Sequence, residues 1–257
     1  MTIRLEHAED GVVTVLIDRP AKRNALTVEM FRQFGEAFTT LDADDAVRCI
    51  VVRGTGGHFC AGSDIDGFDD DRDGREQARR YADFTVAMTD CLKLSRHPTI
   101  ACIQGACVGG GLEIATMCDI RVADRSARFG IPVNRIGLTV DYRELVDLID
   151  IVGHTTALEM LVEGSIFGAE EALNKRVITR IAQDMDVVDM AYGIAATIAR
   201  TAPLVNRWHK KFVRRLREQR PLTGLESNEA YDCFDTEDYR IGRAAFARKE
   251  RPAFVGR

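Results

Sequence analysis

Short apolar runs alternate with helical patterns along the first half of the chain. Between the first two runs, Phe31, Phe34, Phe38 and Leu41 recur at helical spacing, and Thr27 stands before them as a suitable N-cap. Strand, helix and strand in this order predict an α/β core. The runs are rich in β-branched residues and are bounded by glycine, proline or charged residues, as buried strands are: VVTVLI (12–17), CIVV (49–52), TIACI (99–103) and DIRVA (119–123).

The pattern changes after about residue 154, where strands become scarce. Helical spacing dominates in TTALEMLVEG, AEEALNKRV and VVDMAYGIAATIART, and the TAP at 201–203 marks a stop before a last helical portion. We therefore expect an α/β core over residues 1–200 and a helical C-terminal region over residues 201–257. Residues 65–80 are strongly charged and poor in core positions, so they are expected to form a mobile surface loop.

Composition narrows the classes of function. The chain has 257 residues, 46% of them hydrophobic, which is enough for a large core, and a net charge of −5 argues against nucleic acid as the main partner. No apolar run approaches the roughly 20 residues that cross a bilayer, and the charged N-terminus does not resemble a signal peptide. Seven scattered cysteines predict buried thiols in a reducing cytoplasm, and five distant histidines predict no metal site.

One basic run stands out against this acidic background. NRWHKKFVRRLREQR (206–220) contains seven Lys or Arg residues and one Glu. A solvated helix face is the expected arrangement. Contact with an anionic ligand or with another subunit is the alternative.

The segment CVGGGLEIATMCD (107–119) places three glycines and an acid in an apolar helical pattern. Glycine costs a helix about 1 kcal/mol relative to alanine, and an unpaired buried carboxylate is costly too. A glycine-rich turn between a strand and a helix exposes backbone N–H groups at the helix start. The Gly-Lys-Ser/Thr residues of a phosphate-binding Walker loop are absent, and the segment fits the dinucleotide-binding pattern GxGxxG poorly. Close packing of the helix is one explanation for the glycines, and an oxyanion hole is another.

The acid favours the oxyanion hole. The N–H of Gly110 can donate to a carbonyl oxygen that becomes negative during a reaction, and Glu113 lies about one turn later on the same face. A base beside such a donor is what proton transfer next to a carbonyl needs. A second donor is the N–H of Ser63 in the small-residue turn HFCAGSDI (58–65). Taken alone, Glu113 also suits the first turn of a helix or a salt bridge, and HFCAGSDI an ordinary turn.

Four segments together resemble the crotonase (enoyl-CoA hydratase/isomerase) superfamily, in order and over essentially the whole chain: IDRPAKRNALTVEM, HFCAGSDI, GACVGGGLEIATMCDIRVA and AAFARKERPAFVGR. The resemblance implies a crotonase-like (ClpP/crotonase) α/β fold, in which ββα units wind into a superhelix beside a helical C-terminal region. It implies an acyl-CoA thioester as substrate, with coenzyme A as part of that substrate and no other cofactor. It also implies a homotrimer, or a hexamer made of two trimers.

The resemblance assigns roles to individual positions. It places the two oxyanion-hole donors at Ser63 and Gly110, and the first hydratase glutamate at Glu113. Contacts with coenzyme A fall on six positions, of which a neighbouring subunit can supply the last two: Lys22, Ala25, Ala61, Ser63, Phe246 and Lys249.

The chain departs from the family pattern at the second hydratase glutamate. Val133 occupies that position, so the usual two-glutamate water site is incomplete. Asp141 stands where many members have glycine, and some members use an aspartate there as a proton carrier or as a nucleophile. Asp141 is therefore a candidate second carboxylate, with an exposed loop acid as the alternative. Arg143 is expected to be solvated or to recognise a substrate carboxylate, and Asp66 replaces a lysine that binds coenzyme A phosphate in some relatives.

These features order the possible reactions. Hydration of a 2-enoyl-CoA is expected first, because Glu113 is retained and the reaction is common in the family. Isomerisation of an enoyl- or dienoyl-CoA by Asp141 with Glu113 is the alternative that Val133 favours. Dehalogenation ranks third, without a matching histidine and tryptophan. A non-catalytic acyl-CoA-binding protein is the alternative from another class, and the retained turns and Glu113 argue against it.

Overall fold

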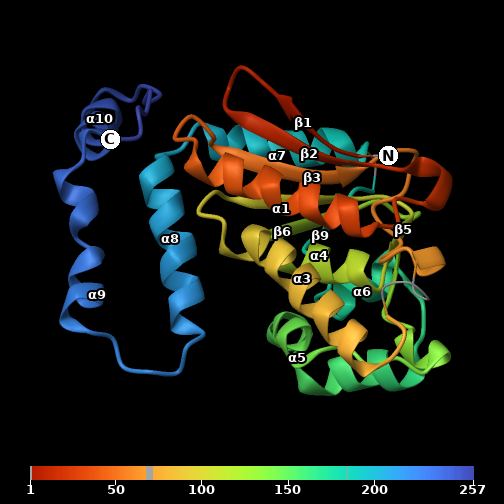
Figure 1. The fold of residues 1–257 in the computed structure, drawn as a ribbon. Helices are drawn as coiled ribbons and strands as arrows, with labels where there is room; N and C mark the ends of the chain where they lie inside the picture. Colours follow the sequence, from red (N-terminus) through yellow and green to blue (C-terminus); the bar gives the residue numbers. More distant parts are fainter. Residues whose placement is uncertain (1, 68–71, 184) are drawn as a thin grey trace.

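A six-stranded sheet forms the centre of the computed structural model, which describes residues 2–67, 72–183 and 185–257 (Figure 1). The strand order is β1-β2-β3-β4-β6-β9, and only β1 runs antiparallel to its neighbour within this sheet. The four predicted strands are confirmed as β2, β3, β4 and β6. The strands are β1 (Thr2–His7), β2 (Val12–Asp18), β3 (Cys49–Gly54), β4 (Thr99–Ile103), β6 (Ile120–Ala123) and β9 (Arg180–Ile181).

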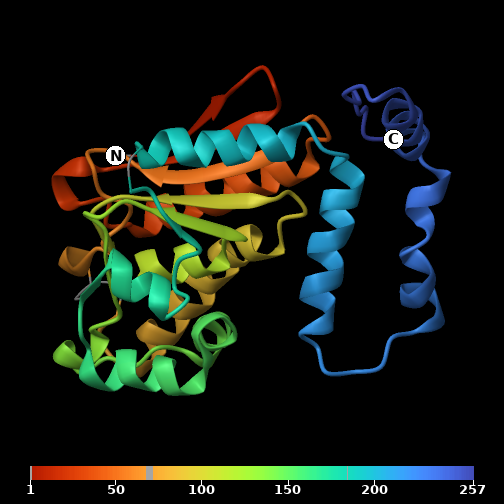
Figure 2. The ribbon, with the colours of Figure 1, turned by 180° about the vertical axis from the view of Figure 1, so that it is seen from behind.

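Helices cover both faces of this sheet (Figures 1 and 2). α7 (Val187–Ala199) packs on one face through Ala191 and Ala195, against residues such as Val12. α1 (Val28–Ala43), α3 (Arg75–Leu94) and α4 (Gly110–Met117) lie on the other face, where Val13 and Val15 join the larger core. Strands buried on both faces need no polar alternation, which explains why they read as continuous apolar runs.

The predicted helix after β2 is confirmed as α1. The side chain of Thr27 accepts a hydrogen bond from the backbone N–H of Met30 and caps the helix, and Phe34 and Phe38 are fully buried. The two rings lie 4.9 Å apart between their centroids. The apolar face of α1 thus closes one side of the core.

The loop expected over residues 65–80 is only partly present. α3 begins at Arg75, so the prediction is wrong for residues 75–80, while residues 68–71 lie outside the described residues. The buried positions of α3 begin only at Thr85 and continue with Val86, Thr89 and Leu92. The first turns carry only exposed or half-buried side chains, so their composition resembles that of a loop. Packing of α3 against α1 stabilises the helix, which local composition cannot reveal.

A smaller three-stranded sheet lies beside the first and leads into the candidate site. It contains β5 (Ala106–Val108), β7 (Arg128–Gly130) and β8 (Phe167–Gly168). β5 is followed at once by Gly109 and α4. Backbone hydrogen bonds of a short parallel β-bridge between residues 60 and 107, whose thiols are free, join the turn at 58–65 to β5. After β7 come the 3-10 turn η3 (Val133–Ile136), α5 (Tyr142–Glu163) and α6 (Ala169–Asn174).

The C-terminal helices extend away from the sheet as an arm (Figures 1 and 2). The chain turns between Ala199, the end of α7, and Pro203, the start of α8. The arm comprises α8 (Pro203–Leu216), α9 (Gly224–Glu229), the 3-10 turn η4 (Asp232–Asp235) and α10 (Glu237–Arg248). Within the described residues, no helix has the length and apolar character needed to cross a membrane.

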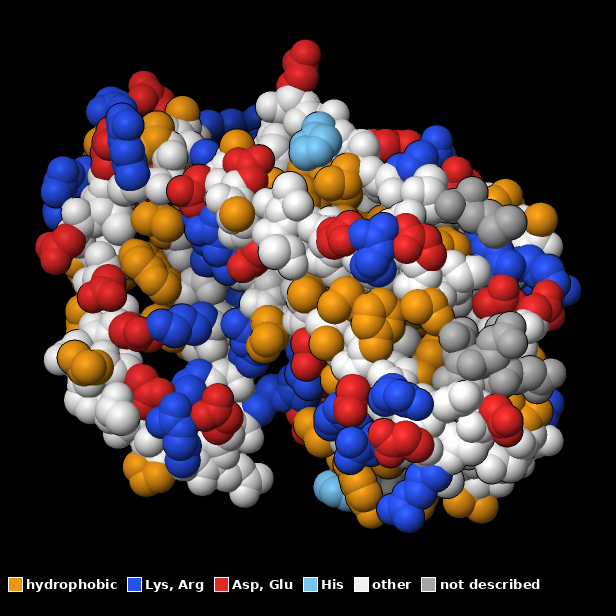
Figure 3. Space-filling view, in the orientation of Figure 1, with side chains coloured by type: hydrophobic (Ala, Val, Ile, Leu, Met, Phe, Trp, Pro, Cys, Tyr) orange, Lys and Arg blue, Asp and Glu red, His pale blue; other side chains and the backbone are white. Residues whose placement is uncertain are grey.

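The basic run of α8 holds this arm against the core, so the expectation of a solvated face is wrong. Lys210 forms an ion pair with Asp119 at 2.8 Å and donates to the carbonyl oxygen of His97. The Arg217 guanidinium binds the carboxylate of Asp147 at 2.9 Å. Figure 3 shows Lys and Arg side chains gathered along the border between arm and core. The partners of Lys210 and Arg217 lie far away in sequence, so the sequence alone did not reveal them.

Candidate active site

The three glycines of 107–119 serve different purposes. Gly109 is the N-cap of α4 with a φ of +55°, a conformation that side-chain-bearing residues rarely adopt. A Cβ atom on Gly111 would lie 2.1 Å from the carbonyl oxygen of Cys60, so this position permits the helix to pack closely. Gly110 has neither constraint, because an added Cβ there meets no atom closer than 3.6 Å. Close packing therefore accounts for Gly111, and it leaves Gly110 to be explained by the site.

The structure brings Ser63 and Gly110 together. A Cβ atom on Gly110 would lie 3.7 Å from the amide nitrogen of Ser63, and one on Gly62 would lie 3.3 Å from the amide nitrogen of Gly110. In the described part of the chain, neither the Ser63 nor the Gly110 amide has a hydrogen-bond acceptor. The neighbouring residues are tied down, since Leu26 N–H donates to Gly62 O at 2.8 Å and Gly109 N–H donates to Gly130 O at 2.9 Å. Two adjacent amides are thus left available to a ligand.

Glu113 lies beside these amides. Its Oε2 would be 3.6 Å from a Cβ on Gly110, which puts the carboxyl group within reach of the same ligand. Protein atoms surround the carboxyl group, although part of the residue stays accessible to solvent. Burial, first, and the nearby charge of Glu144 together raise the pKa of Glu113 to about 8, while the charge of Arg72 opposes the shift. At neutral pH this glutamate is able to hold or release a proton.

Asp141 is placed differently from the sequence expectation of a second carboxylate facing Glu113. It is the N-cap of α5, and its carboxylate accepts hydrogen bonds from the backbone N–H of Arg143 at 2.9 Å and from the Arg143 guanidinium at 2.8 Å. These bonds lower the pKa of Asp141. Arg143 also binds Asp83 at 2.9 Å, so this arginine is engaged with two acids. Asp141 thus acts here as a helix cap within an ion-pair chain.

Glu144 and Arg72 are the charged neighbours of Glu113 that sequence reasoning missed. Glu144 lies in the first turn of α5, and Arg72 stands just before α3 with its guanidinium 3.7 Å from the ring centroid of Tyr81. Burial raises the pKa of Glu144. A signal for Glu144 was present in the sequence, because Asp141 and Glu144 have capping-box spacing. Val133, in contrast, is half-buried and packs against the core.

The segments expected to hold coenzyme A lie next to each other. Ala61 N–H donates to Arg23 O at 3.0 Å, and Ala25 is buried. Lys22, which the resemblance assigns to coenzyme A, forms an exposed ion pair with Asp66 at 2.7 Å. This hydrogen bond raises the pKa of Lys22. A phosphate would therefore have to share this ammonium group with Asp66.

A buried ion pair and a buried asparagine stabilise the two turns that carry Lys22 and Ser63. Arg19 pairs with Asp64 at 2.6 Å, and both side chains are largely buried. Asn24, fully buried, donates to Thr55 O at 2.8 Å and accepts from Arg19 N–H at 2.9 Å. The turns carrying Lys22 and Ser63 are thereby held together.

Phe246 and Lys249 lie elsewhere, on and just after α10 of the arm. Phe246 is 87% exposed, and Lys249 ends the helix with a φ of +56°. In Figure 1, α10 lies at the opposite side of the molecule from the start of β5. Within one chain the structure does not bring these two residues to Ser63.

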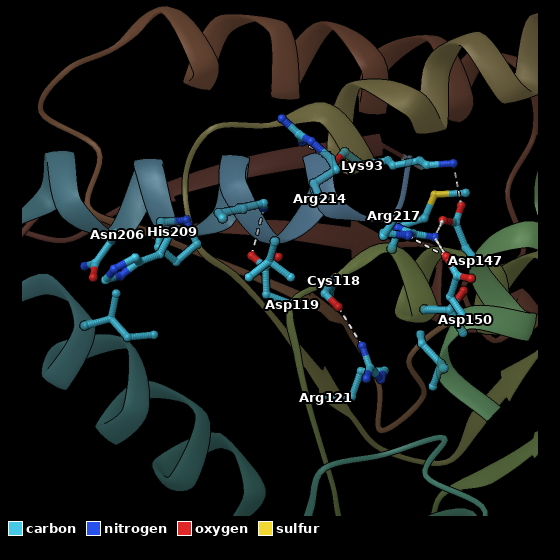
Figure 4. Close-up of a pocket in the computed structure, with 17 residues that line it drawn as sticks. Lys93, Cys118, Asp119, Arg121, Asp147, Asp150, Asn206, His209, Arg214 and Arg217 are labelled. Atoms are coloured by element: carbon cyan, nitrogen blue, oxygen red, sulfur yellow. Dashed lines mark hydrogen bonds and ion pairs between the residues drawn. The ribbon is translucent and has the colours of Figure 1, made fainter. Parts of the chain in front are cut away.

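A separate cavity of about 540 Å³ lies between α8 and the core (Figure 4). It contains none of the oxyanion-hole residues. Its acids are already paired, Asp147 with Lys93 at 2.9 Å and Asp119 with Lys210 at 2.8 Å. Figure 4 shows Arg217 directed at Asp147 and Asp150. These groups join the arm to the core and are distinct from the site around Glu113.

The geometry at α4 suits one kind of chemistry. Two amides at the start of a helix can stabilise an oxygen that gains negative charge, and a carboxyl group with a raised pKa can move a proton beside it. Together these features fit the formation of an enolate from a carbonyl compound.

Known proteins resemble this chain along its length. The family model for enoyl-CoA hydratase/isomerase matches residues 7–257. The enoyl-CoA hydratase EchA19 of Mycobacterium tuberculosis is 31% identical, over 95% of this chain and 92% of its own. The peroxisomal Delta(3,5)-Delta(2,4)-dienoyl-CoA isomerase of Arabidopsis thaliana is 28% identical, over 97% of this chain and 95% of its own.

A solved structure agrees closely with the fold. An enoyl-CoA hydratase/carnithine racemase from Magnetospirillum magneticum superposes with a TM-score of 0.97 at 40% identity, covering 99% of this chain and 96% of that one. The crotonase-like fold expected from the sequence is therefore confirmed. The chain belongs to the enoyl-CoA hydratase/isomerase family, the crotonase superfamily, and is an enzyme of that family.

Proposed function

We propose that this enzyme adds water to the double bond of a 2-enoyl-CoA. The observation that carries the proposal is the position of the Glu113 carboxyl group beside two amides, those of Ser63 and Gly110, that have no acceptor among the described residues. The thioester oxygen binds between the two amides. Glu113 transfers a proton to or from the substrate carbons next to the thioester.

The amides lower the energy of the enolate. When water attacks the β carbon, the electron pair of the double bond moves towards the thioester and its oxygen becomes negative. Two N–H groups at the start of α4 and in the adjoining turn stabilise that charge, and the loss of one such donor typically costs about 10²–10³ in rate. The raised pKa of Glu113 keeps a proton available near neutral pH.

Coenzyme A lies along the turns that carry Lys22, Ala25, Ala61 and Ser63. The hydrogen bond from Ala61 N–H to Arg23 O joins these turns and supports this placement. The ammonium group of Lys22 contacts a phosphate in exchange for Asp66. No further cofactor takes part in the reaction.

A second copy of the chain completes the coenzyme A site in a homotrimer or a hexamer. The support is the exposed apolar surface of the arm, which includes Phe246, Leu225 and Val213 at 87%, 82% and 68% exposure. Such a surface is costly in water unless another subunit covers it. Phe246 and Lys249 of one subunit then reach the coenzyme A of a neighbour.

Isomerisation of an enoyl- or dienoyl-CoA is the second candidate reaction. The observation that favours it is the apolar side chain of Val133, which cannot hold a water molecule by hydrogen bonds. The similarity to a dienoyl-CoA isomerase points the same way. Such a reaction moves a proton between carbons and consumes no water.

Two substrates distinguish the candidates. The purified enzyme is incubated with crotonyl-CoA and with a 3,5-dienoyl-CoA, and the ultraviolet absorbance of each thioester is followed. Hydration predicts loss of the conjugated absorbance of crotonyl-CoA, whereas isomerisation predicts a change only with the dienoyl-CoA. Absence of turnover over a panel of acyl chain lengths would overturn both candidates.

A further inference from the structure

We propose that Glu144 is the second proton-transferring carboxylate of this active site, forming with Glu113 an acid–base pair that shares one proton. The inference rests on the proposed function and deepens it. It supplies the carboxylate that is missing at Val133 from a different element, the first turn of α5. It also replaces Asp141 in the role that the sequence suggested.

The face of α5 that carries Glu144 is directed towards the core. Leu148 lies four residues later on the same face, is 2% exposed and belongs to the core cluster that contains Leu112 and Ile114 of α4. α4 and α5 pack against each other. Glu113 is in the first turn of α4 and Glu144 in the first turn of α5, and the charge of Glu144 acts on Glu113, so the two acids belong to one cluster.

A capping box holds Glu144 in position. Its Oε2 accepts the backbone N–H of Asp141 at 3.3 Å, while the side chain of Asp141 caps the helix in return. The Arg143 guanidinium hydrogen-bonds the carboxylate of Asp141 and not that of Glu144. Among the described residues, the one hydrogen-bond donor to the Glu144 carboxyl group is the backbone N–H of Asp141. A carboxyl group with one backbone bond and a half-buried environment retains capacity to bind a water molecule and to exchange a proton.

The charges around the pair favour a single shared proton. Glu113, Glu144 and Arg72 come from three elements, and the charge of Arg72 acts on both glutamates. At the start of α5, the carboxylate of Asp141 also raises the pKa of Glu144, and the guanidinium of Arg143 lowers it. Burial disfavours ionisation of both glutamates, and the charge of Glu144 adds to this effect at Glu113, so one proton is shared between them. Two neighbouring carboxyl groups that cannot both ionise have separated pKa values, so at one pH one of them acts as an acid and the other as a base.

The pair can carry out hydration with all atoms accounted for. The ionised glutamate takes a proton from water as the water oxygen bonds to the β carbon. The π electrons move to the α carbon and onto the thioester oxygen, which the Ser63 and Gly110 amides bind. The protonated glutamate then gives its proton to the α carbon, and the carbonyl group reforms. The pair ends with one proton, as it began.

Glu144→Gln is the test variant. Glutamine keeps the capping hydrogen bond to Asp141 N–H but can neither accept nor release a proton, so the fold is retained. We expect kcat on the enoyl-CoA substrate to fall about 100-fold or more, with an unchanged melting temperature and unchanged KM. The profile of kcat/KM against pH should lose one of its two limbs.

Asp141→Asn is the matched control. Asparagine is as good an N-cap as aspartate, so α5 keeps its start. We expect activity within about threefold of the wild type, as befits a residue without a proton-transfer role. Near-normal activity of Glu144→Gln together with a large loss in Asp141→Asn would overturn the proposal and restore the sequence expectation.

An infrared titration gives a readout without turnover. The carbonyl band of protonated Glu113, identified by its loss in Glu113→Gln, should titrate at lower pH in Glu144→Gln than in the wild type, and should shift less in Asp141→Asn, whose carboxylate acts on Glu144 and not directly on Glu113. An unchanged midpoint in Glu144→Gln would overturn the pairing. Full activity of Glu113→Gln, or no turnover by the wild type, would instead refute the proposed function, so the two failures are distinguishable.

Discussion

Gly110 and Glu113 stand one helical turn apart at the start of α4, and a Cβ atom on Gly110 would lie 3.6 Å from Oε2 of Glu113. The same added carbon would lie 3.7 Å from the amide nitrogen of Ser63. A single methyl group at this point would therefore occupy the space between a carboxyl group and two amides. Nothing in the backbone forbids it, because the nearest contacts are ordinary van der Waals distances.

Gly110→Ala should fold normally and lose activity. The added methyl group fits without strain but displaces the thioester oxygen from the amides, so we expect kcat/KM to fall about 100-fold or more. Alanine is also the better helix former, by up to about 1 kcal/mol. Enoyl-CoA turnover and thermal unfolding, measured on the same preparation, check both parts. Full activity would show that the thioester does not bind at Gly110.

Gly111→Ala is the contrasting variant one residue later. Its Cβ would meet the carbonyl oxygen of Cys60 at 2.1 Å, so the helix must move away from the turn. We expect a loss of stability of about 1–3 kcal/mol, seen in chemical denaturation. Equal stability of the two alanine variants would contradict the separate roles of the two glycines.

Glu113→Gln should reduce turnover about 10²–10⁴-fold while leaving coenzyme A binding intact. Glutamine has the same shape but cannot exchange protons. Steady-state kinetics give the first quantity, and displacement of a fluorescent coenzyme A derivative gives the second. A parallel loss of coenzyme A affinity would point to a binding role for Glu113.

The same variant should be more stable than the wild type at alkaline pH. The pKa of Glu113 is about 8 in the fold, above its ordinary 4.5, so the folded protein retains a proton that the unfolded chain releases between these values. Stability therefore falls as pH rises through this window. Glutamine removes that loss, which we expect to be on the order of 1–3 kcal/mol at pH 8 and absent near pH 4.5. Urea denaturation at both pH values measures it, and a larger gain at the lower pH would reverse the assignment.

Lys210→Met should loosen the C-terminal arm. The Lys210 side chain is 10% exposed and binds Asp119 at 2.8 Å, so its loss leaves a partly buried carboxylate without its cation. We expect about 1–3 kcal/mol of destabilisation by chemical denaturation. Lys211→Met is the control, since Lys211 is 53% exposed and its surface pair with Glu229 is expected to contribute below about 1 kcal/mol.

Phe246→Ser should weaken both assembly and coenzyme A binding if a neighbouring subunit uses this side chain. An aromatic ring that is 87% exposed in one chain contributes little to the fold of that chain, so its melting temperature at high dilution should change little. Light scattering measures the size of the assembly, and KM reports the coenzyme A contact. An unchanged assembly and an unchanged KM would contradict the neighbour's role.

The outline of the fold was predictable because its signals are local. β2, β3, β4 and β6 are continuous apolar runs bounded by breakers, and the spacing of Phe34 and Phe38 behind Thr27 defines α1. α3 was not predictable from composition at its start, because most side chains of residues 75–80 are charged and none is buried, while packing against α1 stabilises that helix. The partners of the basic run of α8 were not predictable for a related reason, since those of Lys210 and Arg217 lie 67 to 113 residues away.

The sequence by itself determined the order of strands and helices, the glycine turn before α4 and the adjacency of Gly110 and Glu113, all of which depend on residues close together in the chain. Only the tertiary structure decided which amides, acids and cations meet. It brought the Ser63 turn, 47 residues before Gly110, against α4 through the backbone β-bridge between residues 60 and 107. It paired Asp141 with Arg143 and packed α5, which carries Glu144, against α4, which carries Glu113. Charges interact over a few ångströms of space, whatever their separation along the chain, so their partners are settled only when the helices pack.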